Sequence, residues 1–133
     1  MTDRYHDMAP AGLPAAPGYS QVASAAGRMV FVAGQVAMDE QGSLVGPGDV
    51  GRQAEQVFRN IDAALKAAGS SFRDVVKLNY YLVDIGSLPV IRLVRDRYVD
   101  TTNPPAATAV EVRALFRPEY LIEADAVAVV EAE

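Results

Sequence analysis

The feature that most constrains this sequence is a helical pattern of apolar residues between positions 49 and 68. Asp49 is a suitable N-cap, and Gly69 is a suitable residue just beyond the helix C-terminus. An amphipathic helix of this kind needs a second layer on which to bury its apolar face. The apolar positions, spaced for one helix face, are Val50, Ala54, Val57, Phe58, Ile61, Ala64, Leu65 and Ala68.

Runs of β-branched and aromatic residues on both sides of this helix predict strands. A weak strand over residues 18–26 and a short strand over residues 29–33 are expected to pair as a hairpin. A second helix is expected after Ser87, with Pro89 in its first turn. The remaining strands are expected over residues 74–84, 108–114 and 121–130.

This order of elements, with β-hairpins at both ends, predicts an α+β fold in which two helices cover one face of a mixed β-sheet. The chain has 133 residues, half of them apolar, which is the size and composition of one ordinary domain. Residues 1–16 are rich in proline and lack apolar periodicity, so we expect a flexible N-terminal lead-in. Residues 17–133 are then expected to form a single domain.

The composition excludes several kinds of site. The net charge of −5 and the lack of a basic run argue against a nucleic-acid partner. The absence of cysteine removes thiolate catalysis and sulfur-ligated metals, and it fits the reducing cytoplasm. His6 is the only histidine, which excludes a metal site of the two-histidine type. No apolar run is long enough to cross a membrane. We therefore expect a cytoplasmic protein that binds no metal and no membrane.

Two carboxylates near the C-terminus are the first candidates for chemistry. Glu123 and Asp125 lie two residues apart on an expected strand, so they share one face of the sheet. Their neighbours in sequence are apolar, so the two carboxylates are expected to point away from the helices. A pair of this kind could act as acid and base. The alternative is a pair of exposed or interface charges.

Three further residues could contact a ligand. Tyr19 could orient a ligand or a water through its hydroxyl, or it could simply pack its ring at a sheet edge. Gly34 would let the backbone approach a ligand closely, or it could mark a bulge. Arg92 lies on the second helix among arginines that suit a solvated face, although one of them could bind a carboxylate in a bidentate manner.

The run N-P-P-A-A-T-A-V-E-V leads into the fourth expected strand with unusually small side chains. Ala106, Ala107, Thr108 and Ala109 leave space at the start of that strand. The space is open to three interpretations: a binding site, a crowded packing point, or a site that has lost its chemistry.

Several segments carry a resemblance when they are taken together. They are Gly18-Tyr19-Ser20-Gln21, FVAGQV (31–36), QAEQVFRNIDAALKAAGSSFRDVVK (53–77), YLVD (81–84), and NPP…AVEV followed by LIEADAVAV. In this order they resemble the Rid family, the reactive intermediate deaminases, also called YjgF-type or L-PSP-like proteins. The resemblance extends from about Pro17 to Val130.

The resemblance implies a chorismate-mutase-like subunit that assembles into a barrel-like homotrimer with ligand clefts between subunits. Active members of the family hydrolyse short-lived enamines and imines to 2-oxo acids and ammonia, without a metal or cofactor. In that chemistry a cation holds the substrate carboxylate, and a protein carboxylate positions the attacking water.

The sequence departs from the pattern of active members at the residues that carry this chemistry. The arginine that holds the carboxylate is matched by Ala107, and the following serine by Thr108. The water-positioning glutamate is matched by Leu121, and Glu123 matches the glutamate two residues later. The second-strand serine is replaced by Ala33, and a helix asparagine aligns near Arg92, whereas Tyr19, Gly34 and Glu123 keep the pattern.

Two functions follow from these departures. The first is a Rid-fold protein whose intersubunit cleft binds another small molecule, since Ala33, Ala107 and Leu121 would make the cleft roomier and more apolar. The second is a hydrolytic deaminase with relocated groups, in which Arg92 holds the carboxylate and Glu123 positions water. A chaperone-like or regulatory trimer is a third class. Ribonuclease activity is disfavoured by the acidic charge and the lack of an available histidine.

Overall fold

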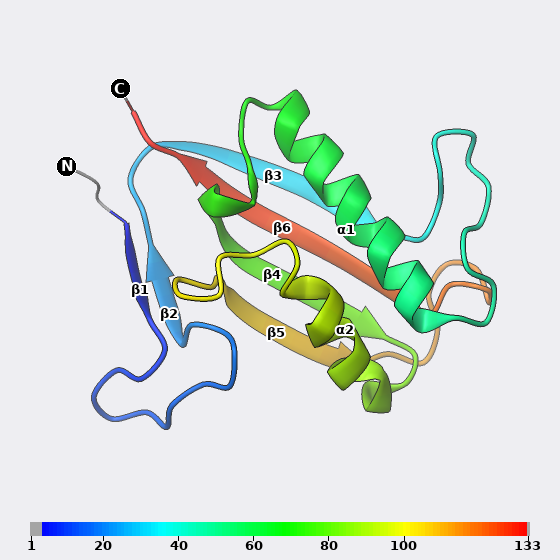
Figure 1. Cartoon of the computed structure of the whole chain (residues 1–133), viewed down its shortest axis with the longest axis horizontal. Coiled ribbons are helices and arrows are strands. Elements are labelled where there is room, and N and C mark those ends of the chain that lie inside the picture. Colours follow the sequence, from blue (N-terminus) through cyan, green and yellow to red (C-terminus); the bar gives the residue numbers. More distant parts are fainter. Residues whose placement is uncertain (1–3, 133) are drawn as a thin grey trace.

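The computed structural model describes residues 4–132 (Figure 1). The first three residues of the expected lead-in, and Glu133 at the end of the expected domain, lie outside the described residues. The strands are β1 (Tyr5–Asp7), β2 (Val22–Ser24), β3 (Arg28–Gln35), β4 (Val75–Leu82), β5 (Ala106–Glu111) and β6 (Ile122–Val130). The α-helices are α1 (Val50–Ala67) and α2 (Leu88–Arg95), and the 3-10 helices η1 (Phe72–Asp74) and η2 (Ile85–Ser87) precede β4 and α2.

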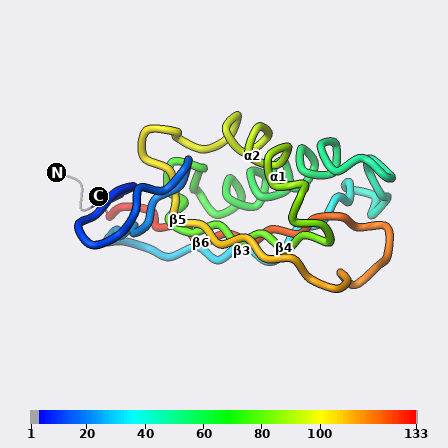
Figure 2. Tube along the Cα trace, turned by 90° about the horizontal axis from the view of Figure 1, so that it is seen from below, coloured from blue at the N-terminus to red at the C-terminus, as the bar shows by residue number. Residues whose placement is uncertain are grey.

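The central element is a four-stranded mixed sheet with the strand order β3-β6-β4-β5. Strand β6 pairs antiparallel with β3 and with β4, whereas β4 and β5 are parallel. Both helices lie on one side of this sheet, as the two perpendicular views show (Figures 1 and 2). The predicted α+β layer, with two helices on one face of a mixed sheet, is therefore confirmed.

Helix α1 is built as its sequence pattern indicates. The Asp49 side chain caps the helix by accepting a hydrogen bond from the Arg52 amide at 3.1 Å. Gly69, with a φ of 72°, ends it in a left-handed conformation. The ring of Phe58 is fully buried and lies within 5.4 to 6.3 Å, centroid to centroid, of three other aromatic rings. Those rings belong to Phe72, Tyr80 and Tyr98.

Alternation along β4 and β6 divides their side chains between two faces. Side chains such as Leu78, Tyr80 and Ala124 are buried beneath the helices. The intervening residues face the other side, which no helix covers (Figure 2). We call this uncovered side the open face. It carries Met29 and Phe31, whose side chains are 56% and 72% exposed.

The expected hairpins are wrong at both ends of the chain. Strand β2 pairs with β1 and not with β3, and β3 pairs instead with β6. Gly27 was expected in the turn of the hairpin, but it allows the backbone at the start of β3 to lie close to the end of β6. A Cβ at this position would lie 2.0 Å from the carbonyl oxygen of Val130. At the other end, β5 pairs in parallel with β4 and makes no hairpin with β6.

The segment expected as a flexible lead-in contains strand β1 and is attached to the domain by side chains. Arg4 forms ion pairs of 2.8 Å with Asp74 and with Glu131. The His6 ring nitrogen Nδ1 lies 3.0 Å from the carbonyl oxygen of Pro104. Sequence periodicity misses this segment because charges and hydrogen bonds, and not an apolar face, connect it to the domain.

Gly51 offers a direct test of the helix assignment. It lies in the first turn of α1, where an added Cβ would meet the Val90 Cγ1 atom at an ordinary contact of 3.4 Å. Gly51→Ala is therefore expected to raise the free energy of unfolding by about 0.5–1 kcal/mol, because alanine loses less backbone entropy in a helix. Urea denaturation measures the change, and a loss of stability would contradict the assigned contact.

Candidate functional site

Glu123 and Asp125 lie on the open face, as their alternation predicts. Asp125 is engaged through both oxygens: the Asn79 amide donates to Oδ1 at 2.7 Å and the Tyr81 hydroxyl donates to Oδ2 at 3.0 Å. Glu123, paired opposite Tyr81 in the sheet, forms no hydrogen bond or ion pair with residues 4–132. The two carboxylates therefore differ: Asp125 is held in place, and Glu123 is available for a ligand or a water.

Gly34 lies against Glu123 at a β-bulge. The register between β3 and β6 shifts between Val32 and Gln35, so Ala33 and Gly34 are the extra residues of the bulge. A Cβ at Gly34 would lie 2.1 Å from the Glu123 Oε2 atom. The glycine therefore leaves room for the Glu123 carboxylate, and the bulge interpretation of Gly34 is confirmed, whereas its approach to a ligand stays a prediction. A cavity of about 400 Å³ opens beside Gly34, with Phe116 on its wall. We call Gly34, Glu123 and Asp125 the open-face half-site.

The surroundings of Glu123 and of the neighbouring Tyr81 raise the pKa values of these two groups. Partial burial, assisted by the nearby charge of Asp125, raises the pKa of the Glu123 carboxyl above its ordinary value. The hydrogen bond to Asp125 raises the pKa of the Tyr81 hydroxyl, which stays protonated and continues to donate. A half-buried carboxylate with a raised pKa and a free lone pair is suited to accepting a proton or orienting water.

The raised pKa of Glu123 has a consequence for stability. The folded protein binds this proton more tightly than the unfolded chain, so stability falls as pH rises from the ordinary value of 4.5 through the folded-state pKa. Glu123→Gln removes that loss. The variant is expected to be more stable than the wild type at pH 7, with the difference vanishing well below pH 4.5. Thermal denaturation across this pH range checks the sign, and a destabilised variant at pH 7 would contradict it.

The small residues at the start of β5 divide between the two faces. Ala107 and Ala109 are half-buried and pack against the core beneath the helices. Thr108 lies between them in sequence and faces the opposite side, where its Oγ1 accepts a hydrogen bond from the Lys77 Nζ at 2.8 Å. The space suggested by the sequence is therefore on the helix side of the sheet, and Thr108 is not part of it.

Two arginines of α2 gather on this helix side. Arg95 is 6% exposed, and Arg92 is half-buried one turn earlier. Both reduce the pKa of Tyr80 electrostatically, although burial of the Tyr80 side chain dominates and raises that pKa well above its ordinary value. Tyr80 pairs with Ala109 in the sheet, so the arginines, the tyrosine and the alanines share one region. We call Arg92, Arg95, Tyr80, Ala107 and Ala109 the helix-side half-site.

Tyr19 lies at the outer edge of β5. The next residue, Ser20, bridges to Ala106 in a parallel arrangement and donates its hydroxyl hydrogen bond to the Pro104 carbonyl at 2.6 Å. Tyr19 itself is half-buried. It therefore lies beside the helix-side half-site, where both of its expected roles, ligand contact and edge packing, stay open.

Leu121 lies one residue before β6 and contributes mainly its backbone. Its amide donates to the Gln53 Oε1 at 2.8 Å, and its carbonyl accepts from the Val83 amide at 3.3 Å. These bonds fix the start of β6, and through it the position of Glu123. Among the described β6 residues, Glu123 is the carboxylate that lies over Gly34.

The expected site residues therefore form two groups on opposite faces of one sheet. The open-face half-site carries the carboxylates, and the helix-side half-site carries the cations. The sheet separates them, so one chain cannot bring both groups onto one small ligand. A site that uses both groups requires the open face of one copy to meet the β5 edge of another.

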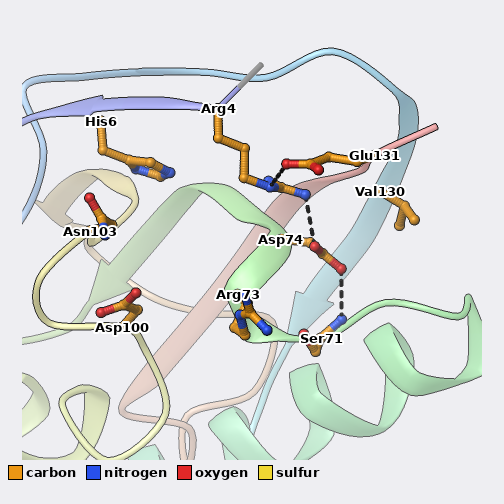
Figure 3. Close-up of a pocket in the computed structure, with 9 residues that line it drawn as sticks. All are labelled: Arg4, His6, Ser71, Arg73, Asp74, Asp100, Asn103, Val130 and Glu131. Carbon is orange, nitrogen blue, oxygen red and sulfur yellow. Dashed lines mark hydrogen bonds and ion pairs between the residues drawn. The ribbon is translucent and has the colours of Figure 1, made fainter. Parts of the chain in front are cut away.

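A cavity near the N-terminal strand contains none of the expected site residues. It has a volume of about 560 Å³ and lies between β1 and the segment before β5 (Figure 3). Its wall mixes opposite charges, since it is lined by Arg4 and Arg73 and also by Asp74, Asp100 and Glu131. Across residues 4–132 there is no cluster of side chains that could hold a metal ion, and no helix is long and apolar enough to cross a membrane.

Comparison with known proteins agrees with this fold. The endoribonuclease L-PSP family model matches residues 10–130. A RutC family protein of Synechocystis sp. is 37% identical over 130 residues, covering 97% of this chain and 98% of that protein. The 2-iminobutanoate/2-iminopropanoate deaminase of Rattus norvegicus is 36% identical over 116 residues, covering 87% of this chain and 83% of that enzyme.

Solved structures give the same result. A protein of unknown function of the Rid family, YyfB from Yersinia pestis, matches with a TM-score of 0.82 and 32% identity, over 96% of this chain and 99% of that one. The fold and the sequence together define a small α+β protein of the L-PSP type. The chain belongs to the Rid family, as its motifs indicated.

The expectation that the arginines of the second helix line a solvated face is wrong for Arg95, which is buried, and sequence reasoning missed Tyr80. The signal was present, because Arg95 follows Ile91 and Val94 at helical spacing and so falls on the buried stripe of α2. Burying an unpaired arginine is energetically costly, so an arginine on a buried stripe is expected to have an ion-pair partner or to bind a ligand. Arg92, which the sequence offered as the ligand contact, is less buried than Arg95.

Proposed function

We propose that this protein is a cytoplasmic homotrimer that binds small molecules in clefts between its subunits and lacks the standard enamine and imine deaminase activity of active Rid proteins. The observation that carries the proposal is the separation of the two half-sites on opposite faces of the sheet. In a closed ring of three copies, each open-face half-site can meet the helix-side half-site of the next subunit.

The open face has the composition of a buried interface. Met29 and Phe31 project from β3 with most of their side chains exposed in the single chain, and Val110 on β5 is 40% exposed. Apolar side chains gathered on one uncovered sheet face favour association. The polar row that includes Asn79 and Asp125 is already internally hydrogen-bonded, so its burial leaves few unpaired groups.

The proposed lack of standard activity rests on Ala107. Strand β5 offers no cation at this position, and the alanine packs toward the core. Removing a bidentate clamp on a charged ligand group costs about 2–5 kcal/mol. By the rule of 1.4 kcal/mol per decade, this corresponds to a loss of roughly 30- to several-thousand-fold.

A second candidate function is hydrolysis by relocated groups. Glu123 over Gly34 favours it, because a free carboxylate with a raised pKa can position water. Arg92 makes no ion pair with the other described residues and could hold a substrate carboxylate from the neighbouring subunit. The name of the rat relative, 2-iminobutanoate/2-iminopropanoate deaminase, states that this enzyme deaminates imines of this kind, and this similarity supports the second candidate.

The test is hydrolysis of freshly generated 2-aminoacrylate, followed as pyruvate release, with the rat deaminase assayed alongside. We expect this protein to be at least about 30-fold slower than the rat enzyme. Equal rates would overturn the proposal. An intermediate rate that falls in both Arg92→Ala and Glu123→Gln would establish the second candidate, and an intermediate rate unchanged in both variants would exclude it.

A further inference from the structure

Arg95 is a buried cation whose pairing within the chain is incomplete. Its side chain is 7% exposed, and its Nε and Nη2 atoms donate at 3.0 and 2.9 Å to the same oxygen, Oδ1 of Asp96. A carboxylate that engages a guanidinium fully uses both of its oxygens in two parallel bonds. The burial of Arg95 is therefore offset only in part by Asp96, and the guanidinium is suited to a better-placed carboxylate.

A second buried polar group lies beside Arg95 without a partner. The Tyr80 side chain is 3% exposed, and its hydroxyl lies close to Arg95 but makes no hydrogen bond of ordinary geometry with the described residues. Because burial raises its pKa, the hydroxyl stays protonated and can donate. Leaving such a group unsatisfied costs about 1–3 kcal/mol, so an orphaned hydroxyl next to a buried guanidinium points to an absent acceptor.

The guanidinium of Arg95 reaches the outer edge of β5. Arg95 extends from α2 to Gly18, where a Cβ would lie 2.7 Å from its Nη2 atom. Gly18 precedes the Ser20 bridge to Ala106, so it lies at the outer edge of β5. The Arg95 side chain therefore lies near Tyr80, which pairs with Ala109 in the sheet, and reaches Gly18 at the outer edge of β5. The strand whose small side chains first suggested an empty cleft thus lies near a cation supplied by another element.

Asp96 lies between this buried pair and the solvent. Its side chain is 46% exposed, whereas that of Arg95 is 7% exposed. A rotation of Asp96 away from the helix end would uncover Arg95 without any change in the backbone. The carboxylate of Asp96 therefore occupies the position that an incoming acid would take.

We propose that Arg95 and Tyr80 form a binding site for the carboxylate of a small organic acid, and that Asp96 occupies this site until the acid displaces it. This inference rests on the proposed small-molecule cleft and names the class of its ligand. Arg92, one turn earlier on α2, adds positive charge at the entrance. The cation that position 107 lacks is supplied by α2.

The test is the affinity of the intact protein for pyruvate, measured by calorimetry or NMR titration, with pyruvamide as the uncharged analogue. Asp96→Asn should tighten pyruvate binding about tenfold, because the competing carboxylate is gone while the helix end is kept. Arg95→Lys should weaken it about tenfold or more, since lysine cannot form two parallel bonds. Pyruvamide should bind weakly and should gain nothing from Asp96→Asn.

The matched control is Arg97→Lys, at an exposed arginine just beyond the same helix, which should leave pyruvate affinity unchanged. A purely structural Arg95 predicts weaker binding in both Arg95→Lys and Asp96→Asn, so tightening by Asp96→Asn separates the two roles. Unchanged or weaker pyruvate binding in a folded Asp96→Asn variant would overturn the proposal.

Failure of this site and failure of the proposed function are distinguishable. Rapid deamination of 2-aminoacrylate would contradict the proposed lack of standard activity, yet tighter pyruvate binding in Asp96→Asn would still support the Arg95 site. Slow deamination together with an unaltered affinity in Asp96→Asn would keep the proposed function and exclude Arg95.

Discussion

Phe31→Asp is expected to convert the protein from the proposed trimer into a folded monomer. The Phe31 side chain is 72% exposed on the open face, where the proposed interface would bury it. Burying a phenylalanine side chain contributes about 1.5–3 kcal/mol, and the aspartate adds the cost of an unpaired buried charge at each of the three interfaces. Light scattering after gel filtration should therefore fall from about three times the chain mass of 14.2 kDa to the chain mass itself.

Leu93→Asp is the matched control for this variant. Leu93 has the same exposed fraction, 72%, but lies on the outer side of α2. It should keep the trimer mass. A Phe31→Asp variant that retains the wild-type mass, or a wild-type protein that is already monomeric, would contradict the role of the open face.

Gly34→Ala is expected to displace Glu123 and to remove its function. The added Cβ would lie 2.1 Å from Oε2 and 2.9 Å from Cδ of Glu123, so the carboxylate must move toward water. The backbone at Gly34 is not in the left-handed region, so alanine is tolerated there without strain. A displacement of this size costs about 100-fold in any reaction that depends on the placed group. The pKa of Glu123, followed by NMR of its carboxyl carbon, should fall toward its ordinary value as burial is lost.

Gly51→Ala provides the control, because it makes the same substitution where the added atom meets only ordinary contacts. It should leave the titration of Glu123 unchanged. If Glu123 titrates in the Gly34→Ala variant as it does in the wild type, the bulge does not hold the Glu123 carboxylate in place. If any residual 2-aminoacrylate hydrolysis is also unchanged, Glu123 is not the group that positions water.

Periodicity predicted the parts of the fold that one apolar face determines. The spacing around Phe58 gave α1 with its cap, and alternation around Glu123 placed the carboxylates on the open face. The partners of the strands could not be predicted in this way. Gly27 looked like a hairpin turn, although its function is to let β3 run close to β6.

The sequence predicted several residues of the candidate site, but it did not predict on which face of the sheet each of them lies. Family motifs identified Gly34, Glu123 and Ala107, but no linear pattern indicates that the sheet separates the first two from the third. Arg95 was missed because its importance arises from burial against Tyr80, which depends on how α2 crosses the sheet.

The most direct test of the central claim, that one site is shared by two subunits, is subunit mixing. Arg92→Ala damages the helix-side half-site and Gly34→Ala the open-face half-site, so pyruvate binding should be weak in each homotrimer. When differently tagged copies of the two variants are co-expressed in equal amounts, about one quarter of the clefts combine two intact half-sites, and calorimetry should recover that fraction of wild-type sites. Recovery of no sites in the mixed trimers, with pyruvate bound normally by the wild type, would contradict the account.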